Sequence, residues 1–250
     1  MKLHMKNIKN MYSTLTLPKL NINFVIIEFD MNMKRAVIFD MDGVIVDSEP
    51  LHKKAYHMMF KEFELNVSDE LYASFTGMAT LLICKKLCEV FSLNFSPKHL
   101  VNRKRIYFKE LFDQGQTLQL IDGVLDLIQH YNQNGIVLIL ASSASMSNIN
   151  RIFKKFGLDS YFKAKISGAD LKASKPHPEI FEIAVKLSGF QKEECMVIED
   201  ASNGIQAAKA AGIFCVAFDA NLSKKQDFSK ADLVVQNFDA LRLENLNYLK

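Results

Sequence analysis

The sequence lacks internal repeats, low-complexity tracts and long hydrophobic runs, and only four of its 250 residues are cysteines. Cys84 and Cys88 lie one helical turn apart, but no histidine or second cysteine pair near them could complete a zinc site. Cys195 and Cys215 fall in apolar runs typical of buried strands. These features favour a reduced, cytoplasmic setting over a disulfide framework or a zinc site.

An excess of one charge sign is also missing. The chain has 31 basic and 28 acidic residues, a net charge of +3, and its longest basic cluster is Arg103-Lys104-Arg105. So short a cluster is typical of a solvated helix face. We therefore expect neither nucleic acid nor membrane as a partner, and we expect a monomer that binds a small molecule.

The first 33 residues do not resemble a targeting segment. Their apolar run, Phe24–Ile27, is too short for a signal peptide or a membrane helix, and no small-residue cleavage site follows it. We interpret residues 1–33 as an N-terminal extension of doubtful structure, with translation starting at Met31 or Met33 rather than Met1. The competing interpretation is an additional strand or arm.

From Arg35 onward, apolar runs alternate with helical segments. Gly157, Gly189 and Gly212 each follow a predicted helix, and Pro178 begins one of them. Strands are predicted at Ala36–Asp40, Ile136–Ala141, Lys165–Ser167, Met196–Glu199, Phe214–Phe218 and Leu233–Val235. Alternation of this kind predicts an α/β fold built on a doubly wound, mostly parallel sheet.

One segment interrupts the alternation. Between Ser48 and about Asp113 only helical periodicity is present, with helix starts predicted at Ser48, Ser68 and Ser96. The sequence thus predicts a helical cap domain over residues 48–114, inserted into an α/β core of residues 34–47 and 115–250. Because ligand pockets form preferentially between domains, the cap is a plausible lid.

Polar side chains follow four predicted strands. Asp40 and Asp42 follow the first strand, Ser142 and Ser143 the second, Lys175 lies beyond the third, and Glu199-Asp200 ends the fourth. A serine after a strand, or a lysine before proline, is more often a turn or surface residue when taken alone. In a parallel sheet, however, all four strand ends meet at one edge, where ligands bind.

These side chains suit phosphoryl transfer. Mg²⁺ binds proteins through a few carboxylates and keeps sites for phosphate oxygens, so Asp40 and Asp200 could hold it. A carboxylate can attack phosphorus to give an aspartyl-phosphate, while Lys175 and the Ser142 hydroxyl bind the phosphate oxygens. Asp42 would serve as the general acid and base, its side chain holding a proton while Asp40 is ionised.

These motifs resemble those of the haloacid-dehalogenase-like phosphohydrolases. Residues 40–50, DMDGVIVDSEP, resemble the first motif of that superfamily, and Leu140–Ser143, Ser174–Pro178 and Ile198–Ile205 are similar to the second, third and fourth. The resemblance covers Arg35 to about Asp219, and the nearest subgroup is that of β-phosphoglucomutase-like enzymes and sugar-phosphate phosphatases.

The resemblance implies a role for each site residue. Asp40 would be the nucleophile and Asp42 the acid and base. Mg²⁺ would be held by Asp40, the backbone carbonyl of Asp42, Glu199 and Asp200. The phosphate and substrate would be bound by Ser142, Ser143, Lys175, the cap-loop glycine Gly77 and the cap residue His52.

The choice between phosphatase and mutase depends on a second phosphate site. Mutases of this type carry an arginine three residues after the loop glycine, where this sequence has Thr80, and polar groups where it has Ala144 and Met146. His52 and Lys104 do match mutase cap residues. We expect a Mg²⁺-dependent phosphatase of a sugar or polyol phosphate, with a β-phosphoglucomutase-like isomerase as the alternative. A phospho-aspartate signalling receiver is a remote third possibility, because receivers carry no inserted cap.

Overall fold

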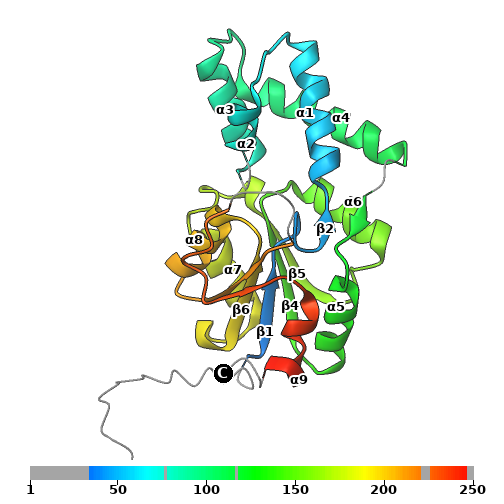
Figure 1. Ribbon diagram of the computed structural model, residues 1–250, viewed down its shortest axis with the longest axis vertical. Coiled ribbons are helices and arrows are strands. Elements are labelled where there is room, and N and C mark those ends of the chain that lie inside the picture. Colours follow the sequence, from blue (N-terminus) through cyan, green and yellow to red (C-terminus); the bar gives the residue numbers. More distant parts are fainter. Residues whose placement is uncertain (1–33, 76–77, 116–117, 221–225, 247–250) are drawn as a thin grey trace, which may run out of the picture.

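The computed structural model describes residues 34–75, 78–115, 118–220 and 226–246 (Figure 1). Interpretations of residues 1–33 and of Gly77 lie outside these ranges. Six parallel strands form the main sheet in the order β5-β4-β1-β6-β7-β8. Their bounds are β1 Ala36–Phe39, β4 Val137–Ser142, β5 Phe162–Ser167, β6 Cys195–Glu199, β7 Phe214–Phe218 and β8 Leu233–Val235. The predicted doubly wound α/β fold is confirmed.

Helices cover both faces of this sheet. Successive residues of β1 point to opposite faces, as the period of a strand requires. Val37 and Phe39 pack into one core with α5 and α6, whereas Ala36 and Ile38 pack into another with α7 and α8. These helices span α5 Val124–Gln133, α6 Met146–Phe156, α7 Glu179–Ser188 and α8 Ser202–Ala210. The sheet is buried on both sides, which explains why its central strands are continuously apolar.

Four further helices lie between β2 and β3 in the sequence and form a separate bundle at the carboxyl end of the sheet (Figure 1). They are α1 Glu49–Glu62, α2 Asp69–Ala73, α3 Thr80–Val90 and α4 Pro97–Asp113. Ser48, Ser68 and Ser96 are the N-cap residues of α1, α2 and α4, as predicted. The α1–α4 bundle has its own buried residues, among them Met59, Leu87 and Leu100.

Two features of the fold were not predicted. Val46–Asp47 (β2) and Gln119–Leu120 (β3) pair antiparallel where the chain enters and leaves the bundle. A two-residue strand is too short to show alternation in a sequence. β5 also begins at Phe162 rather than Lys165, because the strand lies at an edge of the sheet, where lysines can reach solvent. Within the described ranges no helix is both long enough and apolar enough to cross a membrane.

Candidate active site

The carboxyl end of β1 lies at the centre of the candidate site. The chain passes from β1 to β4 and β5 on one side of the sheet, and returns to place β6, β7 and β8 on the other. Strand order therefore reverses beside β1, and in open α/β sheets ligands bind in the crevice beyond such a point. The pairing of β1 with β6 extends to Asp40, whose N–H donates to the carbonyl of Ile198 at 3.0 Å. This bond fixes the position of Asp40 at the sheet edge.

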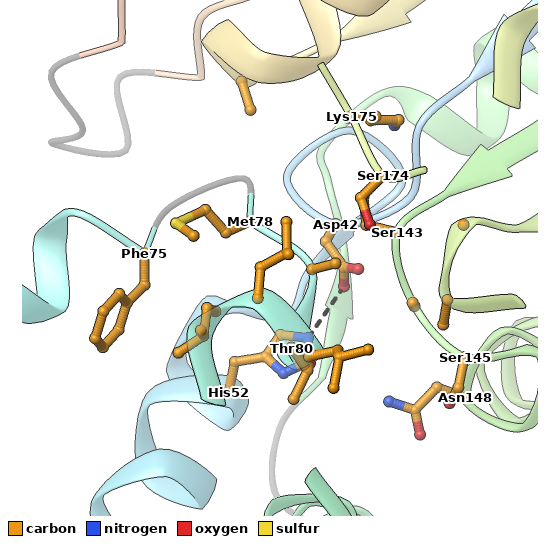
Figure 2. A pocket seen from close by; sticks show the side chains of 18 of the residues that line it. Asp42, His52, Phe75, Met78, Thr80, Ser143, Ser145, Asn148, Ser174 and Lys175 are labelled. Carbon is orange, nitrogen blue, oxygen red and sulfur yellow. Dashed lines mark ion pairs between the residues drawn. The ribbon is translucent and has the colours of Figure 1, made fainter. Parts of the chain in front are cut away.

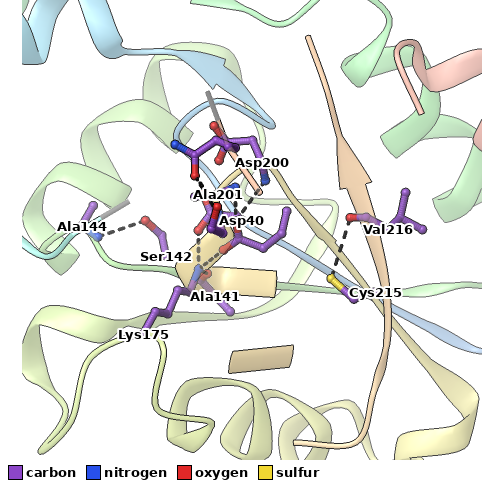
Figure 3. A network of polar contacts seen from close by, with 12 residues as sticks. Asp40, Ala141, Ser142, Ala144, Lys175, Asp200, Ala201, Cys215 and Val216 are labelled. Atoms are coloured by element: carbon purple, nitrogen blue, oxygen red, sulfur yellow. Dashed lines mark hydrogen bonds and ion pairs between the residues drawn. The ribbon is translucent and has the colours of Figure 1, made fainter. Parts of the chain in front are cut away.

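Lys175 joins the ends of three strands (Figure 3). Its Nζ atom donates to Oδ1 of Asp40 at 2.6 Å, to Oε1 of Glu199 at 2.6 Å and to the carbonyl of Ala141 at 2.9 Å. Burial alone would lower the pKa of Lys175, but the charges of Asp40 and Glu199 raise it above its ordinary value. An ammonium group has three hydrogens, and all three are used here. Lys175 is therefore a fixed positive charge at the base of the site.

Glu199 is held as firmly as the lysine it contacts. Its Oε1 atom accepts from Lys175, and its Oε2 atom accepts from the backbone N–H groups of Asp200 and Ala201, each at 3.0 Å. The side chain is 1% exposed. Both oxygens are thus occupied by protein donors, so Glu199 positions Lys175 and the following loop in addition to any contact with a metal.

Three carboxylates form a site that a divalent cation could occupy. Asp40, Glu199 and Asp200 each offer one oxygen, and these oxygens lie within 4.8 Å of one another. Two glycines make room for the group: a Cβ atom at Gly43 would lie 2.1 Å from Oδ2 of Asp200, and one at Gly204 would lie 1.8 Å from Oε1 of Glu199. Hard oxygen donors in a cluster of this kind fit Mg²⁺.

The protein's own charges leave this cluster negative. Burial, together with Glu199 and Asp42, raises the pKa of Asp40 to about 7, although Lys175 acts in the opposite direction. One ammonium group cannot offset three adjacent carboxylates, so the proton-bound form of Asp40 becomes accessible near neutral pH. A cation in the cluster would favour the ionised form.

Asp42 lies on the bundle side and has different partners. Its Oδ1 atom accepts a hydrogen bond from the hydroxyl of Ser48, and Nε2 of His52 lies 3.4 Å from the same oxygen (Figure 2). Nδ1 of His52 accepts from Nζ of Lys104 at 2.6 Å. A neutral imidazole with its hydrogen on Nε2 satisfies both contacts, which assigns that tautomer to His52.

These contacts change the expected protonation of Asp42. Burial alone would raise the pKa of Asp42, but His52, Ser48 and the charge of Lys104 lower it below its ordinary value. Burial and Lys104 lower the pKa of His52. With Mg²⁺ in contact with Asp40, the sequence predicts a protonated Asp42 beside an ionised Asp40, whereas without a cation the protein's own groups favour the reverse order. The difference arises because His52 and Ser48 donate to Asp42, which the sequence did not reveal.

Ser142 and Ser143 are positioned differently although they are adjacent. Ser142 is 1% exposed, and its oxygen accepts the backbone N–H of Ala144 at 3.0 Å, which leaves its own hydrogen available to donate (Figure 3). Ser143, by contrast, lines the cavity (Figure 2). Both lie at the end of β4, next to β1.

A cavity of about 540 Å³ opens between the strand ends and the α1–α4 bundle. Its volume is in the usual range for a small-molecule site. Of the predicted site residues it brings together Asp40, Asp42, His52, Ser143, Lys175, Glu199 and Asp200. Ser142 does not line the cavity, and Gly77 lies outside the described residues.

Sequence reasoning missed three residues of the site: Ser48 as a partner of Asp42, and Gly43 and Gly204 as the space beside the acids. Gly204 could have been recognised from the sequence, because glycine is unfavourable inside a helix. It lies in the first turn of α8, the helix that follows Glu199-Asp200. Ser48 was interpreted only as a helix cap. Its side chain makes no cap hydrogen bond and donates to Asp42 instead.

The arrangement defines a class of protein. A doubly wound sheet with acids at the ends of β1 and β6, a lysine between them and an inserted helical bundle is the architecture of the haloacid-dehalogenase-like hydrolases. The sequence model of that family matches residues 37–218, and the chain belongs to it.

Curated relatives include phosphatases and mutases. Fructose-1-phosphate phosphatase YqaB of Escherichia coli is 30% identical over 72% of this chain and 94% of its own length. Beta-phosphoglucomutase of Bacillus subtilis is 28% identical over 85% of this chain and 94% of its own. Protein SUPPRESSOR OF QUENCHING 1 of Arabidopsis thaliana is 31% identical over 78% of this chain, which spans only 19% of that larger protein.

Solved structures have the same fold. CbbY from Rhodobacter sphaeroides in complex with phosphate has a TM-score of 0.75 at 24% identity, covering 86% of this chain and 99% of that one. Beta-phosphoglucomutase from Clostridium difficile has a TM-score of 0.74 at 25% identity, covering 86% and 96%. The shared fold includes nearly the whole of those proteins.

Proposed function

We propose that the protein is a Mg²⁺-dependent phosphatase that hydrolyses a small phosphorylated metabolite, such as a sugar or polyol phosphate, through an aspartyl-phosphate. The observation that carries the proposal is the placement of Lys175 between Asp40 and Glu199, beside Asp200, at the edge of the sheet. An acid cluster with one fixed cation suits binding of a metal and a phosphoryl group together. The similarity to phosphatases supports this function.

In the first step, a carboxylate oxygen of Asp40 attacks phosphorus while the bond to the ester oxygen breaks. Asp42 acts here in its protonated form, which its contacts with His52 and Ser48 disfavour when no cation lies beside Asp40, and it becomes a carboxylate as it gives that proton to the leaving alkoxide. In the second step, Asp42 takes a proton from water, which attacks the aspartyl-phosphate and releases inorganic phosphate. His52 and Ser48 hold the carboxylate of Asp42 in one orientation throughout, so that it can serve both steps.

The phosphate oxygens need positive charge and hydrogen-bond donors. Lys175 supplies the charge, Ser143 supplies a hydroxyl group on the cavity wall, and we assign a second hydroxyl to Ser142, which is buried beside it at the end of β4. Mg²⁺, held by Asp40, Asp200, the backbone carbonyl of Asp42 and Glu199 directly or through water, would neutralise phosphate oxygens and favour the ionised form of Asp40.

We infer that residues 48–114 act as a cap domain on a core of residues 34–47 and 115–250, and that the cap selects the substrate. The bundle supplies one wall of the cavity, and a closed cavity excludes water during the first step. A cytoplasmic monomer is proposed; the four free cysteines support a reducing location.

A β-phosphoglucomutase-like isomerase is the second candidate. The contact of Lys104 with His52, and of His52 with Asp42, supports this candidate, because both residues match cap residues of mutases in the sequence and Asp42 is the proposed general acid. A mutase must protect its aspartyl-phosphate from water, and a cap that contacts Asp42 could do so. The signalling receiver is disfavoured by the four-helix insertion and by the hydrolase family.

Release of inorganic phosphate from p-nitrophenyl phosphate, followed with and without Mg²⁺, tests the proposal. We expect Mg²⁺-dependent turnover that Asp40→Asn abolishes and that the distant surface variant Asp159→Asn retains. Full turnover by Asp40→Asn would refute the mechanism. Conversion of β-glucose 1-phosphate to an isomeric sugar phosphate without net phosphate release would favour the mutase instead.

A further inference from the structure

The charged residues that line the cavity are divided between its two sides. The acids lie chiefly at the strand ends and at the junction leading to α1: Asp40, Asp42, Asp47, Glu49, Glu199 and Asp200. The helices of the bundle contribute mostly cations, namely Lys85 on α3 and Lys98, Lys104 and Arg105 on α4, beside the acid Glu49 at the start of α1, while the sheet side adds Lys172 and Lys175. The bundle wall, which would face the far end of a bound substrate, therefore carries more cations than acids.

The cations on α4 occupy one face of the helix. Lys98, Asn102 and Arg105 are spaced by four and three residues, the spacing that places side chains one above another. Val101, on the same face, is buried against the bundle and holds it in place. A row of two cations and an amide thus runs along the cavity, with Lys85 contributed from α3.

Lys85, Lys98 and Arg105 differ from other cations of the bundle. Arg103 donates to Glu62 and Tyr107, and Lys109 donates to Asp113. Among the described residues, by contrast, none forms a hydrogen bond or ion pair with the charged groups of Lys85, Lys98 or Arg105. Cations gathered on a cavity wall without protein counter-charges repel one another, and an anion from outside would relieve the repulsion.

We propose that Lys85, Lys98 and Arg105 bind a second anionic group of the substrate, a carboxylate or a phosphate, at the end remote from the phosphoryl group that reacts. This inference rests on the proposed function, which places that phosphoryl group at Asp40. It narrows the substrate class to phosphorylated sugar acids and bisphosphates. Thr80 stands where mutases carry a clamp arginine, and the row on α3 and α4 takes over that role from other positions.

Binding to the Asp40→Asn protein in Mg²⁺ buffer tests the inference without turnover. Calorimetric titrations use ligand pairs that differ in the second anion: glucose 6-phosphate against 6-phosphogluconate, and fructose 6-phosphate against fructose 1,6-bisphosphate. We expect the doubly anionic member of at least one pair to bind about tenfold tighter or more. A preference within the first pair identifies the second anion as a carboxylate, and a preference within the second pair identifies it as a phosphate. The preference should shrink as salt is raised, because the cations are exposed.

Variants then assign the preference to these residues. In the Asp40→Asn protein, the additional double substitution of Lys98→Gln and Arg105→Gln should reduce the ratio of the two affinities within the preferred pair to about threefold or less. Lys109→Gln, which removes a charge from α4 outside the cavity, should leave the ratio unchanged. Three results would each overturn the inference. They are equal affinities within both ligand pairs, no binding by any doubly anionic ligand, and an affinity ratio that the double substitution does not reduce.

The two proposals fail in different ways. Wild-type protein that releases phosphate from p-nitrophenyl phosphate but shows no preference within either pair would refute only the second-anion site. Protein that shows the preference but releases no phosphate from any ester would refute the phosphatase proposal and leave the anion site standing.

Discussion

The Nζ atom of Lys175 lies 2.6 Å from Oδ1 of Asp40, and both side chains are almost fully buried. The same Nζ atom also contacts Glu199, so a single cation is shared by two acids that come from different strands. Truncating one partner of a buried charge pair leaves the other charge without compensation. The contacts of Lys175 with Asp40 and Glu199 therefore contribute both to the stability of this edge of the sheet and to the proposed reaction.

Lys175→Met should destabilise the protein and remove its activity together. We expect a loss of about 3–5 kcal/mol in the free energy of unfolding, because two buried carboxylates lose their ammonium partner. Phosphate release should fall by roughly a hundredfold or more, since a phosphate-neutralising charge is lost. Urea unfolding and turnover of p-nitrophenyl phosphate measure the two effects. Lys186→Met, at an exposed position of α7, is the control and should change neither.

Much of this site could be predicted because Asp40, Ser142 and Glu199 lie at the ends of apolar strands, with Lys175 in the loop beyond β5. The strands β1 and β6 are buried on both faces and read as uninterrupted hydrophobic runs, so Asp40 and Glu199 stand out at their ends. The parallel topology then requires those ends to meet. Helix ends could also be predicted, because Ser68, Gly157 and Gly189 are residue types that begin or end helices whatever the tertiary structure.

The remaining features depend on contacts between distant segments. A sequence does not show that the Ser48 hydroxyl is turned toward Asp42 rather than capping α1, or that Nζ of Lys104 reaches His52 from 52 residues away. The order of the two aspartate pKa values depends on these contacts. The order that the protein's own charges favour without a cation therefore could not be predicted, although the residues themselves were identified.

Ser48 and Ser68 offer a matched test of positioning against stability. Both are N-cap residues, but Ser68 accepts the N–H of Leu71 whereas Ser48 donates to Asp42. Ser68→Ala should cost about 1 kcal/mol of stability and leave turnover unchanged. Ser48→Ala should cost a similar amount, about 1 kcal/mol, yet lower kcat roughly tenfold, because Asp42 loses a donor that orients it. Equal kcat values for the two variants would show that Ser48 has no positioning role.

Gly204→Ala should be harmful although alanine is the better helix former. On an exposed helix the change would gain about 1 kcal/mol. Here the added Cβ would lie 1.8 Å from the carboxylate of Glu199, which is fixed by Lys175 and two backbone N–H groups. We expect a net loss of about 1–2 kcal/mol and at least a tenfold loss of turnover, as the carboxylate is displaced. Asn150→Ala on the exposed side of α6 is the control; a stabilised and active Gly204→Ala would contradict the argument.

Lys104 should make stability depend on pH in the alkaline range. Burial, together with Arg105, lowers the pKa of Lys104 to about 8, while Asp42, Cys84 and Glu49 act in the opposite direction. Between pH 8 and about 10.5 the unfolded chain holds a proton that the folded protein has released, so this residue adds stability as pH rises. The gain is fully present above the unfolded pKa and is lost below pH 8.

Comparison with Lys104→Met isolates that contribution. The difference in unfolding free energy, wild type minus variant, should increase by about 3 kcal/mol at most between pH 7 and pH 10.5. Chemical denaturation of both proteins at several pH values provides the measurement. A difference that stays constant over this range, or one that decreases, would show that Lys104 titrates normally in the folded protein.

Removal of divalent cations should affect both folding and turnover, for one electrostatic reason. Asp40, Glu199 and Asp200 repel one another beside a single lysine, so a bound cation should stabilise the folded state by about 2.7 kcal/mol at a concentration a hundred times its Kd. We expect EDTA to abolish phosphate release and Mg²⁺ to raise the Tm. Asp200→Asn should lose most of this rise, whereas Asp239→Asn, far from the cluster, should keep it. A Tm that does not respond to Mg²⁺ in the wild type would contradict a metal site at these three acids.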